Sequence, residues 1–397
     1  MMREFAITAY LFIIRLIFTL FNMLPLKDKA TFIVSFGDNT QYVYEEMLRQ
    51  DIPFDAVFLC KGKSFDLFKD YESAKVIPFE SGNFLHLIQS IYHVATSKRV
   101  IVDNYFGFLA AVDFRDEVEC IQLWHATGAI KKFGLEDKSV STRTKAAQKR
   151  FRDVYDCFDK VIVGSDVMAT IFGHAFGLDD SRILRTGIPR TDFFFNEQEI
   201  RKNKQQLISQ NPALAEKKVI LYAPTYRDAE LDQFKLQLDI EKMELELGRD
   251  HVLALRLHPA VKNDTDYASM FPGFVYDYSS AEYNINELLS LADILISDYS
   301  SIPYEFSLLK RPMIFFAYDL DEYKRDRGIA IDEFPGPIVR ETESIIELIK
   351  KDAFDYGLLE KYAAKWNKYS RGNASAQLVG YMFGKEAESI REQRRAL

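Results

Sequence analysis

The sequence contains few cysteines, and none of them stands in a metal-binding or disulfide pattern. Cys60, Cys120 and Cys157 lie far apart, and no CxxC or CxxxC pair occurs. A zinc site and a disulfide-stapled fold are therefore not expected, and the chain suits a reducing cytoplasm.

Several catalytic motifs are missing as well. The segment Gly62-Lys63-Ser64 lacks the first glycine of a P-loop at the required spacing. The chain has no HExxH motif and no GxSxG nucleophile elbow. The Glu-x7-Glu pattern of many sugar transferases is absent after Glu305. These absences argue against a P-loop enzyme, a zinc protease and a hydrolase with a nucleophile elbow.

Positive charge is short over the whole chain but concentrated in one segment. The sequence has 51 Lys and Arg against 59 Asp and Glu, and its net charge of −8 argues against a general nucleic-acid binder. In the segment from Lys131 to Arg152 only Glu136 and Asp137, and next to it Asp153, offset the basic residues. This basic segment favours contact with anionic lipid headgroups or a lipid diphosphate, although a solvated charged helix gives the same pattern. Its members assigned to the acceptor and membrane are Lys131, Lys132, Arg143, Lys145, Lys149, Arg150 and Arg152.

The order of apolar runs predicts an α/β fold. With 397 residues, 48% of them hydrophobic, the chain can form two domains with cores of their own. Short runs rich in Val, Ile and Phe alternate with helical patterns, which is typical of a parallel sheet covered on both faces. The strands expected in the first half are Thr31–Phe36, Ala56–Leu59, Arg99–Val102, Cys120–Trp124 and Lys160–Val163, and the helices are Gln41–Arg49, Phe84–Thr96 and Arg143–Tyr155.

A charged stretch, Asn196–Lys218, interrupts this rhythm and marks a domain boundary. The pattern then restarts, which predicts a second doubly wound domain and a cleft between the two. In such sheets ligands bind at the carboxyl ends of the strands. The strands expected in the second half are Lys218–Ala223, His251–Leu257, Asp293–Ser297 and Pro312–Phe316.

The N-terminal segment is long and apolar enough to cross a bilayer. From Phe5 to Leu26 its only formal charge is Arg15, and its polar residues lie on one side of a helix. An arginine at mid-bilayer costs about 2.5–3.5 kcal/mol, which a helix lying in the interface with its polar stripe toward water avoids. We therefore expect an interfacial helix, with a core-packed helix, a true span and an uncleaved signal as alternatives. The stripe consists of Thr8, Arg15, Thr19 and Asn22.

Two histidines follow predicted strands. His125 stands in Trp124–Gly128, where small residues let the backbone turn sharply, and an imidazole there suits a general base at neutral pH. His258, with Arg256 beside it, follows Val252–Leu255 and precedes Pro259. His258 could donate to a pyrophosphate, and Arg256 is assigned to the same donor site. A structural strand-end histidine and a loop histidine remain the alternatives.

Groups that could hold phosphate follow two further strands. Thr225 and Arg227 lie in the segment YAPTYR, where the planar fork of the arginine could reach phosphate oxygens. Ser300 and Ser301 stand where a helix N-cap belongs, and Glu305 in the next turn could reach a ribose. A proline turn with a solvated arginine, an ordinary capping pair and a glutamate that complements the helix dipole explain the same residues.

In combination these segments resemble a known family. WHATG with its following lysines, YAPTYR, RLHP and SDYSS–PYEFSLLKRP–FFAYDLDEY resemble, in order, the CDP-glycerol glycerophosphotransferases of Gram-positive wall teichoic acid synthesis. The likeness runs from about Phe32 to about Leu378. The short chain with one apolar N-terminal helix is most similar to the priming members, whereas polymerase members commonly read W-H-G-T-P at Trp124–Gly128.

The resemblance implies a GT-B type fold of two facing Rossmann-like domains. The expected division is a membrane-associating helix at 1–28, an acceptor domain at 29–196 and a CDP-glycerol-binding domain at 197–372. A C-terminal helix at 373–397 is expected to pack back toward the acceptor domain.

It also implies transfer of glycerol phosphate from CDP-glycerol to a lipid-diphosphate-linked disaccharide, with release of CMP. The enzyme is expected to be peripheral or monotopic, at the cytoplasmic face of the cell membrane. His125 and His258 are the expected catalytic residues, His125 as the base. Donor contacts are expected from Thr225, Arg227, Arg256, His258, Ser300, Ser301 and Glu305.

Cofactor use and reaction class leave alternatives. No cofactor is firmly implied, a loosely bound Mg²⁺ stays open, and the oligomeric state is unknown. The alternative activities are a CDP-glycerol or CDP-ribitol polymerase, a GT-B sugar transferase, and a membrane-anchored protein that kept the nucleotide cleft without turnover.

Overall fold

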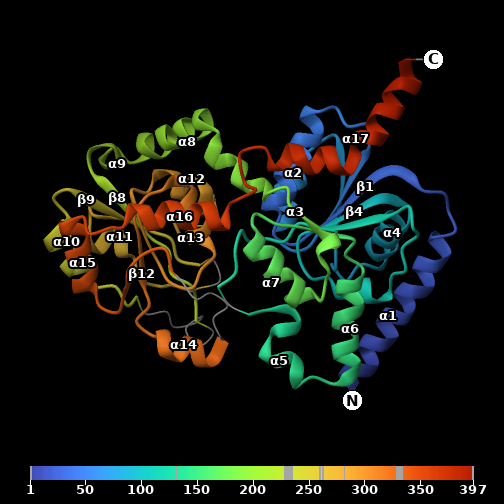
Figure 1. The fold of residues 1–397 in the computed structure, drawn as a ribbon, viewed down its shortest axis with the longest axis horizontal. Helices are drawn as coiled ribbons and strands as arrows, with labels where there is room; N and C mark the ends of the chain where they lie inside the picture. The colour runs from blue at the N-terminus through green and yellow to red at the C-terminus, as the bar shows by residue number, and fades with distance from the viewer. Residues whose placement is uncertain are drawn as a thin grey trace. The chain divides into compact units, whose positions relative to one another are not determined.

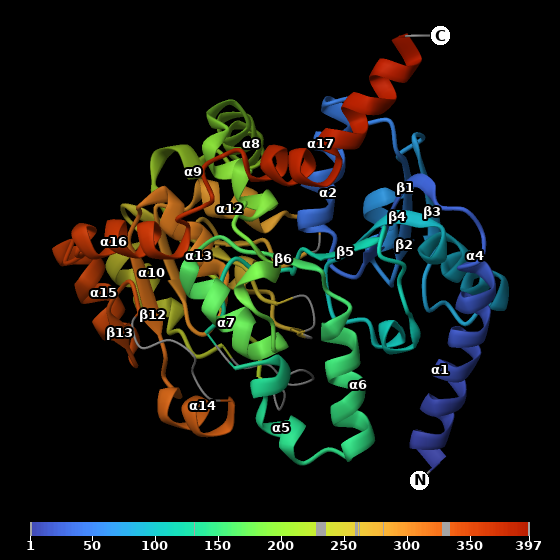
Figure 2. The ribbon, with the colours of Figure 1, turned by 45° about the vertical axis from the view of Figure 1, so that its right-hand side comes forward.

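Two parallel β-sheets carry the fold, one in each of two structural units of the computed structural model (Figures 1 and 2). Unit 1 comprises residues 1–126, 133–192 and 369–397, and unit 2 comprises residues 127–132 and 193–368. The structure describes residues 2–130, 132–227, 236–258, 261, 263–280, 282–327 and 334–395.

Unit 1 contains a seven-stranded sheet in the order β3-β2-β1-β4-β5-β6-β7, with every pair parallel. The strands expected in the first half are confirmed, because each apolar run is buried on both faces. The strands are β1 (Lys27–Val34), β2 (Asp55–Cys60), β3 (Ala74–Pro78), β4 (Ser97–Val102), β5 (Glu119–Gln122), β6 (Lys160–Ile162) and β7 (Ile183–Leu184). The α-helices are α1 (Met2–Phe21), α2 (Asp38–Arg49), α3 (Ser64–Phe68), α4 (Phe84–Ala95), α5 (Lys138–Ser141), α6 (Lys145–Asp156), α7 (Asp166–Phe176) and α17 (Ala374–Arg395).

Unit 2 contains a six-stranded parallel sheet in the order β10-β9-β8-β11-β12-β13. In both sheets the strand order reverses beside the first strand, which is the Rossmann-like arrangement. The strands are β8 (Lys218–Tyr222), β9 (His251–Leu255), β10 (Val275–Asp277), β11 (Ile294–Ser297), β12 (Met313–Phe316) and β13 (Ile338–Val339). The α-helices are α8 (Glu197–Gln210), α9 (Ala213–Glu216), α10 (Ile240–Leu247), α11 (Tyr267–Met270), α12 (Ile285–Leu291), α13 (Ile302–Phe306), α14 (Leu320–Arg327), α15 (Thr342–Lys351) and α16 (Tyr356–Trp366).

The end of the chain returns to unit 1. Leu378, Val379, Met382 and Phe383 of α17 lie in the same apolar core as residues of β1 and β2. The chain passes into unit 2 after Asp192 and returns at 369, where the sequence predicted boundaries at 196 and 372. The segment 127–132 also groups with unit 2, which the sequence did not predict.

Helix α1 has three different sides. Ile14 and Phe18 are only 1% and 2% exposed, and the Phe18 ring packs edge-on against Phe114 at 5.9 Å between centroids. Figures 1 and 2 both show α1 beside α4, and the two helices are in contact. A second side carries Arg15, whose Nη2 donates to the carbonyl of Ala110 (3.4 Å).

The remaining side of α1 is apolar and has no cover among the described residues. Phe5, Phe12, Leu16 and Leu20 are 55–77% exposed. The window Glu4–Phe21 is long and apolar enough to cross a membrane, with a mean hydropathy of 1.9 and 11% of it buried, which by itself is weak evidence. The interfacial and core-packed interpretations therefore each describe one side of this helix.

Candidate active site

His125 follows a strained turn at the carboxyl end of β5. Trp124 has a φ of 56°, in the left-handed region that costs a bulky residue about 1–3 kcal/mol. The backbone N–H of Trp124 donates to Oε1 of Gln122 (2.8 Å), and the Nδ2 of Asn39 donates to the carbonyl of Trp124 (3.0 Å). Because Gln122 and Asn39 are both buried, they hold the turn in this conformation.

Aromatic rings flank the half-buried imidazole of His125. The centroid of the Phe36 ring lies 4.1 Å from that of the imidazole, at an interplanar angle of 18°. The centroid of the Trp124 ring lies 4.3 Å from that of the imidazole, at an interplanar angle of 30°. Two nearly parallel rings this close would overlap on one face, so they lie on opposite faces. Trp124 stacks in turn on Phe133 at 4.9 Å. The imidazole is thereby held in one orientation.

Unit 2 gathers its charged groups around Asp298, at the carboxyl end of β11. Its buried carboxylate accepts from the N–H and Oγ1 of Thr225 (2.9 and 2.5 Å) and from Nη2 of Arg227 (3.0 Å). Arg227 also donates from Nε and Nη2 to both oxygens of Asp319 (2.7 and 3.1 Å). Burial works to raise the pKa of Asp319, but donation from Arg227 and Tyr299 brings it below its usual value.

In the structure, Thr225 and Arg227 bond to their own loop and to two carboxylates. A fourth bond of Arg227 runs from Nη1 to the carbonyl of Thr225, so four of its five N–H groups donate to described residues. The Thr225 hydroxyl donates its proton to Asp298. Both side chains thus hold the surrounding loop in place, and their contact with a donor phosphate stays a prediction.

Ser300 and Ser301 remain suited to bind an anion. Both are half-buried, and Oγ of Ser300 accepts from the N–H of Ile302 (3.2 Å). Ser301 occupies the N-cap position of α13 without a side-chain capping bond. Neither hydroxyl donates a hydrogen bond to any described residue, so both protons are available to phosphate oxygens.

His258 and Arg256 follow β9 but differ in their surroundings. His258 is exposed, with its ring 4.6 Å from that of Tyr226. Arg256 donates from Nη1 to the carbonyls of Tyr278 and Ser280, and burial lowers its pKa. Arg256 therefore fastens the loop after β10, whereas the His258 side chain lies at the surface. Pro259 lies outside the described residues.

Glu305 is buried in the structure. Its side chain has no exposed surface, and its Oε1 accepts from Oγ1 of the equally buried Thr127 (2.7 Å). The expected contact of Glu305 with a ribose stays a prediction. Next to Thr127, a Cβ on Gly128 would lie 2.4 Å from the Tyr304 ring, so only glycine fits. The first half of the WHATG motif thus forms the strained turn that carries His125, and its second half packs within unit 2.

The basic segment is less free than its sequence indicates. Arg150 is paired with Glu4 of α1 at 2.8 Å, and Lys149 with Asp153 at 2.7 Å. The Arg143 guanidinium lies over the Phe151 ring at 4.7 Å. Lys132, Lys145 and Arg152 are exposed, and Lys131 lies outside the described residues.

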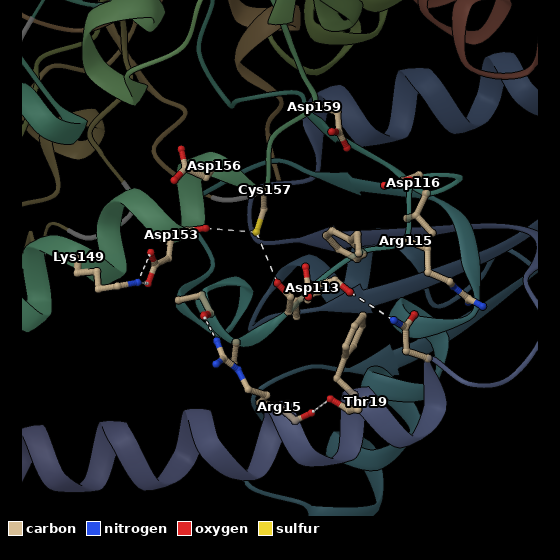
Figure 3. Close-up of a pocket in the computed structure, with 17 residues that line it drawn as sticks. Arg15, Thr19, Asp113, Arg115, Asp116, Lys149, Asp153, Asp156, Cys157 and Asp159 are labelled. Carbon is tan, nitrogen blue, oxygen red and sulfur yellow. Dashed lines mark hydrogen bonds and ion pairs between the residues drawn. The ribbon is translucent and has the colours of Figure 1, made fainter.

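A cavity of about 740 Å³ in unit 1 lies between α1, α6 and the segment after the 3₁₀ helix η1 (Gly107–Ala111) (Figure 3). It is a poor candidate for an anionic substrate, because its carboxylates outnumber its cationic groups. Its charged lining consists of Asp113, Asp116, Asp153, Asp156, Asp159, Arg15, Arg115 and Lys149. Among the described residues, no group of three or more His, Cys, Asp or Glu could hold a metal ion.

The sequence did not predict the side chains that support Trp124 and Arg227. Asp298 lies in the motif SDYSS and Asp319 in FFAYDLDEY, and a carboxylate soon after a buried strand was a usable signal for both. Asn39 had no such signal, because its partner, the carbonyl of Trp124, is distant in the sequence.

Comparison with known proteins identifies the relatives of this chain. The family described as CDP-Glycerol:Poly(glycerophosphate) glycerophosphotransferase matches residues 16–384. A teichoic acid glycerol-phosphate primase of Bacillus spizizenii is 36% identical over 381 residues, covering 95% of this chain and 98% of the relative. A primase of the same description from Bacillus subtilis is 35% identical over 386 residues, covering 96% and 98%.

Polymerases are similar over part of their length and in fold. A teichoic acid poly(ribitol-phosphate) polymerase of Bacillus spizizenii is 32% identical, covering 94% of this chain and 59% of the polymerase. The solved structure of the wall teichoic acid polymerase TagF superimposes with a TM-score of 0.79 at 24% identity, covering 98% and 99% of the two chains. At that identity the superposition shows the fold alone, which is of GT-B type.

Proposed function

This chain belongs to the CDP-Glycerol:Poly(glycerophosphate) glycerophosphotransferase family, and from that premise we propose that it primes a teichoic acid. It transfers one glycerol phosphate from CDP-glycerol to a lipid-diphosphate-linked disaccharide and releases CMP. The observation that carries this proposal is the match to two glycerol-phosphate primases over 98% of their length, against 59% for the polymerase.

The donor binds to unit 2. Ser300 and Ser301 donate their hydroxyl protons to the pyrophosphate, and the exposed His258 adds a further donor. Arg227 keeps the loop in place through Asp298 and Asp319 and offers its remaining N–H. These groups neutralise charge where it develops, which is the main requirement of phosphoryl transfer.

His125 acts as the general base. It takes the proton of an acceptor hydroxyl while that oxygen attacks the phosphorus that bears glycerol. The bond from this phosphorus to the bridging oxygen breaks, and CMP leaves with the bonding electrons. The support for this role is a half-buried imidazole held between two rings at a strand end. The chemistry needs no cofactor, and a donor-bound Mg²⁺ is compatible with it.

The enzyme works at the cytoplasmic face of the cell membrane as a peripheral or monotopic protein. The apolar side of α1 enters the lipid interface, since Phe5, Phe12, Leu16 and Leu20 face away from unit 1. Arg150 joins the first turn of α1 to the basic helix α6, which brings positive charge to the same end. Anionic headgroups and the acceptor's diphosphate are the matching partners.

Release of CMP tests the reaction. The pure protein is incubated with CDP-glycerol and a lipid-diphosphate disaccharide analogue, with CDP-ribitol as the matched donor control. We expect CMP only when CDP-glycerol and the acceptor are both present. Equal release from CDP-ribitol would favour the ribitol enzymes of the family, a teichoic acid ribitol-phosphate primase being 31% identical. No release from either donor would contradict the proposal.

A further inference from the structure

The ring that flanks His125 belongs to an exposed residue. Phe36 lies in the loop after β1, and 46% of its surface is exposed although it is a large apolar side chain. It makes a nearly parallel contact with the imidazole at 4.1 Å. Phe36 therefore contributes little to the apolar core, and its notable contact is the one with the His125 ring.

Asp103 fixes the loop that carries Phe36. It directly follows β4, is 1% exposed, and its Oδ2 accepts from the N–H groups of Phe36 (2.8 Å) and Gly37 (2.9 Å). The N–H of Ser35 donates to both of its oxygens (2.9 and 3.1 Å). Three successive N–H groups thus converge on one carboxylate, which is a side chain with acceptors only.

Gly37 and Asn104 also shape this loop. Gly37 has a φ of 99°, and a Cβ at this position would lie 2.6 Å from Cδ1 of Leu67. Asn104 adds a bond from Nδ2 to Oγ of Ser35 (3.1 Å). Since the backbone on both sides of Phe36 is held, its ring presents a fixed wall to the imidazole.

We propose that Phe36 and Asp103 are positioning residues for His125, Phe36 by stacking on the imidazole and Asp103 by fixing the loop that carries Phe36. This inference rests on the proposed role of His125 as the base. A base must be held within hydrogen-bond reach of its proton, and small misplacements lower the rate steeply. Phe36 and Asp103 therefore affect the chemical step and leave donor binding in unit 2 unchanged.

The test compares Phe36→Leu with Phe36→Tyr in the full chain. We expect Phe36→Leu to lower kcat by about 10- to 100-fold with the KM for CDP-glycerol unchanged. Phe36→Tyr keeps the ring and should stay within about threefold of wild type. Phe195→Leu is the matched control, because Phe195 is also 46% exposed and lies in unit 2. A kcat of Phe36→Leu equal to that of this control would overturn the proposal.

A double variant separates positioning from a general structural effect. If Phe36 acts through the base, His125→Ala combined with Phe36→Leu is no slower than His125→Ala alone. A further tenfold loss in the double variant would contradict the inference. If His125→Ala itself retains full activity, the base assignment fails first, which distinguishes the two failures.

Asp103→Asn extends the test one step farther from the imidazole. Asp103→Asn should also lower kcat. The amide N–H₂ of asparagine would take the place of a carboxylate oxygen and face backbone N–H groups, which cannot accept its hydrogen bonds. Thermal unfolding of Asp103→Asn shows whether a lower kcat comes from misfolding. If it does, the proposal is tested by the variants of the exposed Phe36 alone.

Discussion

At the scale of single residues, the proposed function assigns the proton transfer to His125. Its removal should lower turnover by about 10²–10⁴, the usual contribution of a general base. Calorimetric titration of His125→Ala with CDP-glycerol should give nearly the wild-type affinity, because the proposed donor contacts lie in unit 2. A variant that keeps more than half of the wild-type turnover contradicts the assignment.

Substitution of Arg227 should mainly lower stability, whereas substitution of Ser301 should mainly weaken CDP-glycerol binding. Arg227→Ala leaves the buried Asp298 without its ion-pair partner, so the free energy of unfolding should fall by about 3–5 kcal/mol. Ser301→Ala should barely change stability but weaken CDP-glycerol binding by about 1.5–3 kcal/mol, since a hydrogen bond to a charged phosphate is lost. Chemical denaturation and calorimetry on both variants check this contrast. Equal loss of stability in the two would show that Ser301 is structural.

The buried ammonium of Lys29 should make the free energy of unfolding depend on pH. This ammonium is 3% exposed, donates to Oγ1 of Thr96 (2.6 Å), and its pKa is lowered from 10.5 to about 8, mainly by burial and further by Lys27. Between pH 8 and 10.5 the unfolded chain binds more protons at this site than the folded chain does. The stability contributed by Lys29 therefore rises with pH across this window.

Comparison with Lys29→Met isolates this effect. The free energy of unfolding of wild type relative to Lys29→Met should increase from pH 8 to pH 10.5. Urea unfolding of both proteins across this range measures it. A difference that is constant or falls with rising pH would contradict the lowered pKa.

The residues also show where sequence reasoning stops. The placement of His125, His258 and the serine pair after strands could be predicted, because each follows an apolar run within a few positions, whereas their roles stay predictions. The commitment of Arg227 to Asp319 could not, since the two are 92 positions apart and meet only through the order of the strands. Burial of Glu305 against Thr127 has the same cause.

At the scale of elements, α1 is the most informative. The helical spacing of its residues predicted a polar stripe and an apolar side. That spacing could not show which side would pack against the rest of unit 1. The structure packs Ile14 and Phe18 inward and leaves Phe12 and Leu16 outward, at 67% and 55% exposure.

This division predicts two separable effects. The double variant Phe12→Gln, Leu16→Gln should bind phosphatidylglycerol vesicles at least tenfold more weakly at unchanged stability, because each apolar group kept from lipid forfeits about 1.5–3 kcal/mol. Phe18→Ala is the matched control, and should lose about 3–5 kcal/mol of unfolding free energy with vesicle binding retained. Sedimentation and denaturation measure the two effects. Full sedimentation of the double variant with the vesicles would show that Phe12 and Leu16 do not form the membrane contact.

At the scale of the whole molecule, the sequence predicted both sheets, because parallel strands buried on two faces appear as continuous apolar runs. It did not predict that 127–132 groups with unit 2 or that unit 1 resumes at 369. Those features depend on contacts between distant segments, such as Leu378 and Phe383 of α17 in the core of unit 1.

The distance between the acceptor hydroxyl and the lipid diphosphate limits the product of the proposed reaction. A base needs hydrogen-bond reach of about 2.6–3.2 Å, and after one addition the new terminal hydroxyl lies one glycerol phosphate farther from the lipid diphosphate. If that diphosphate is held at the basic segment, the new hydroxyl no longer reaches His125, and transfer stops.

Mass spectrometry of the product under excess CDP-glycerol tests this central claim most directly. The acceptor analogue should gain the mass of one glycerol phosphate and no more, however long the incubation. A ladder of many additions would identify a polymerase, and an unchanged acceptor would remove the transferase account itself.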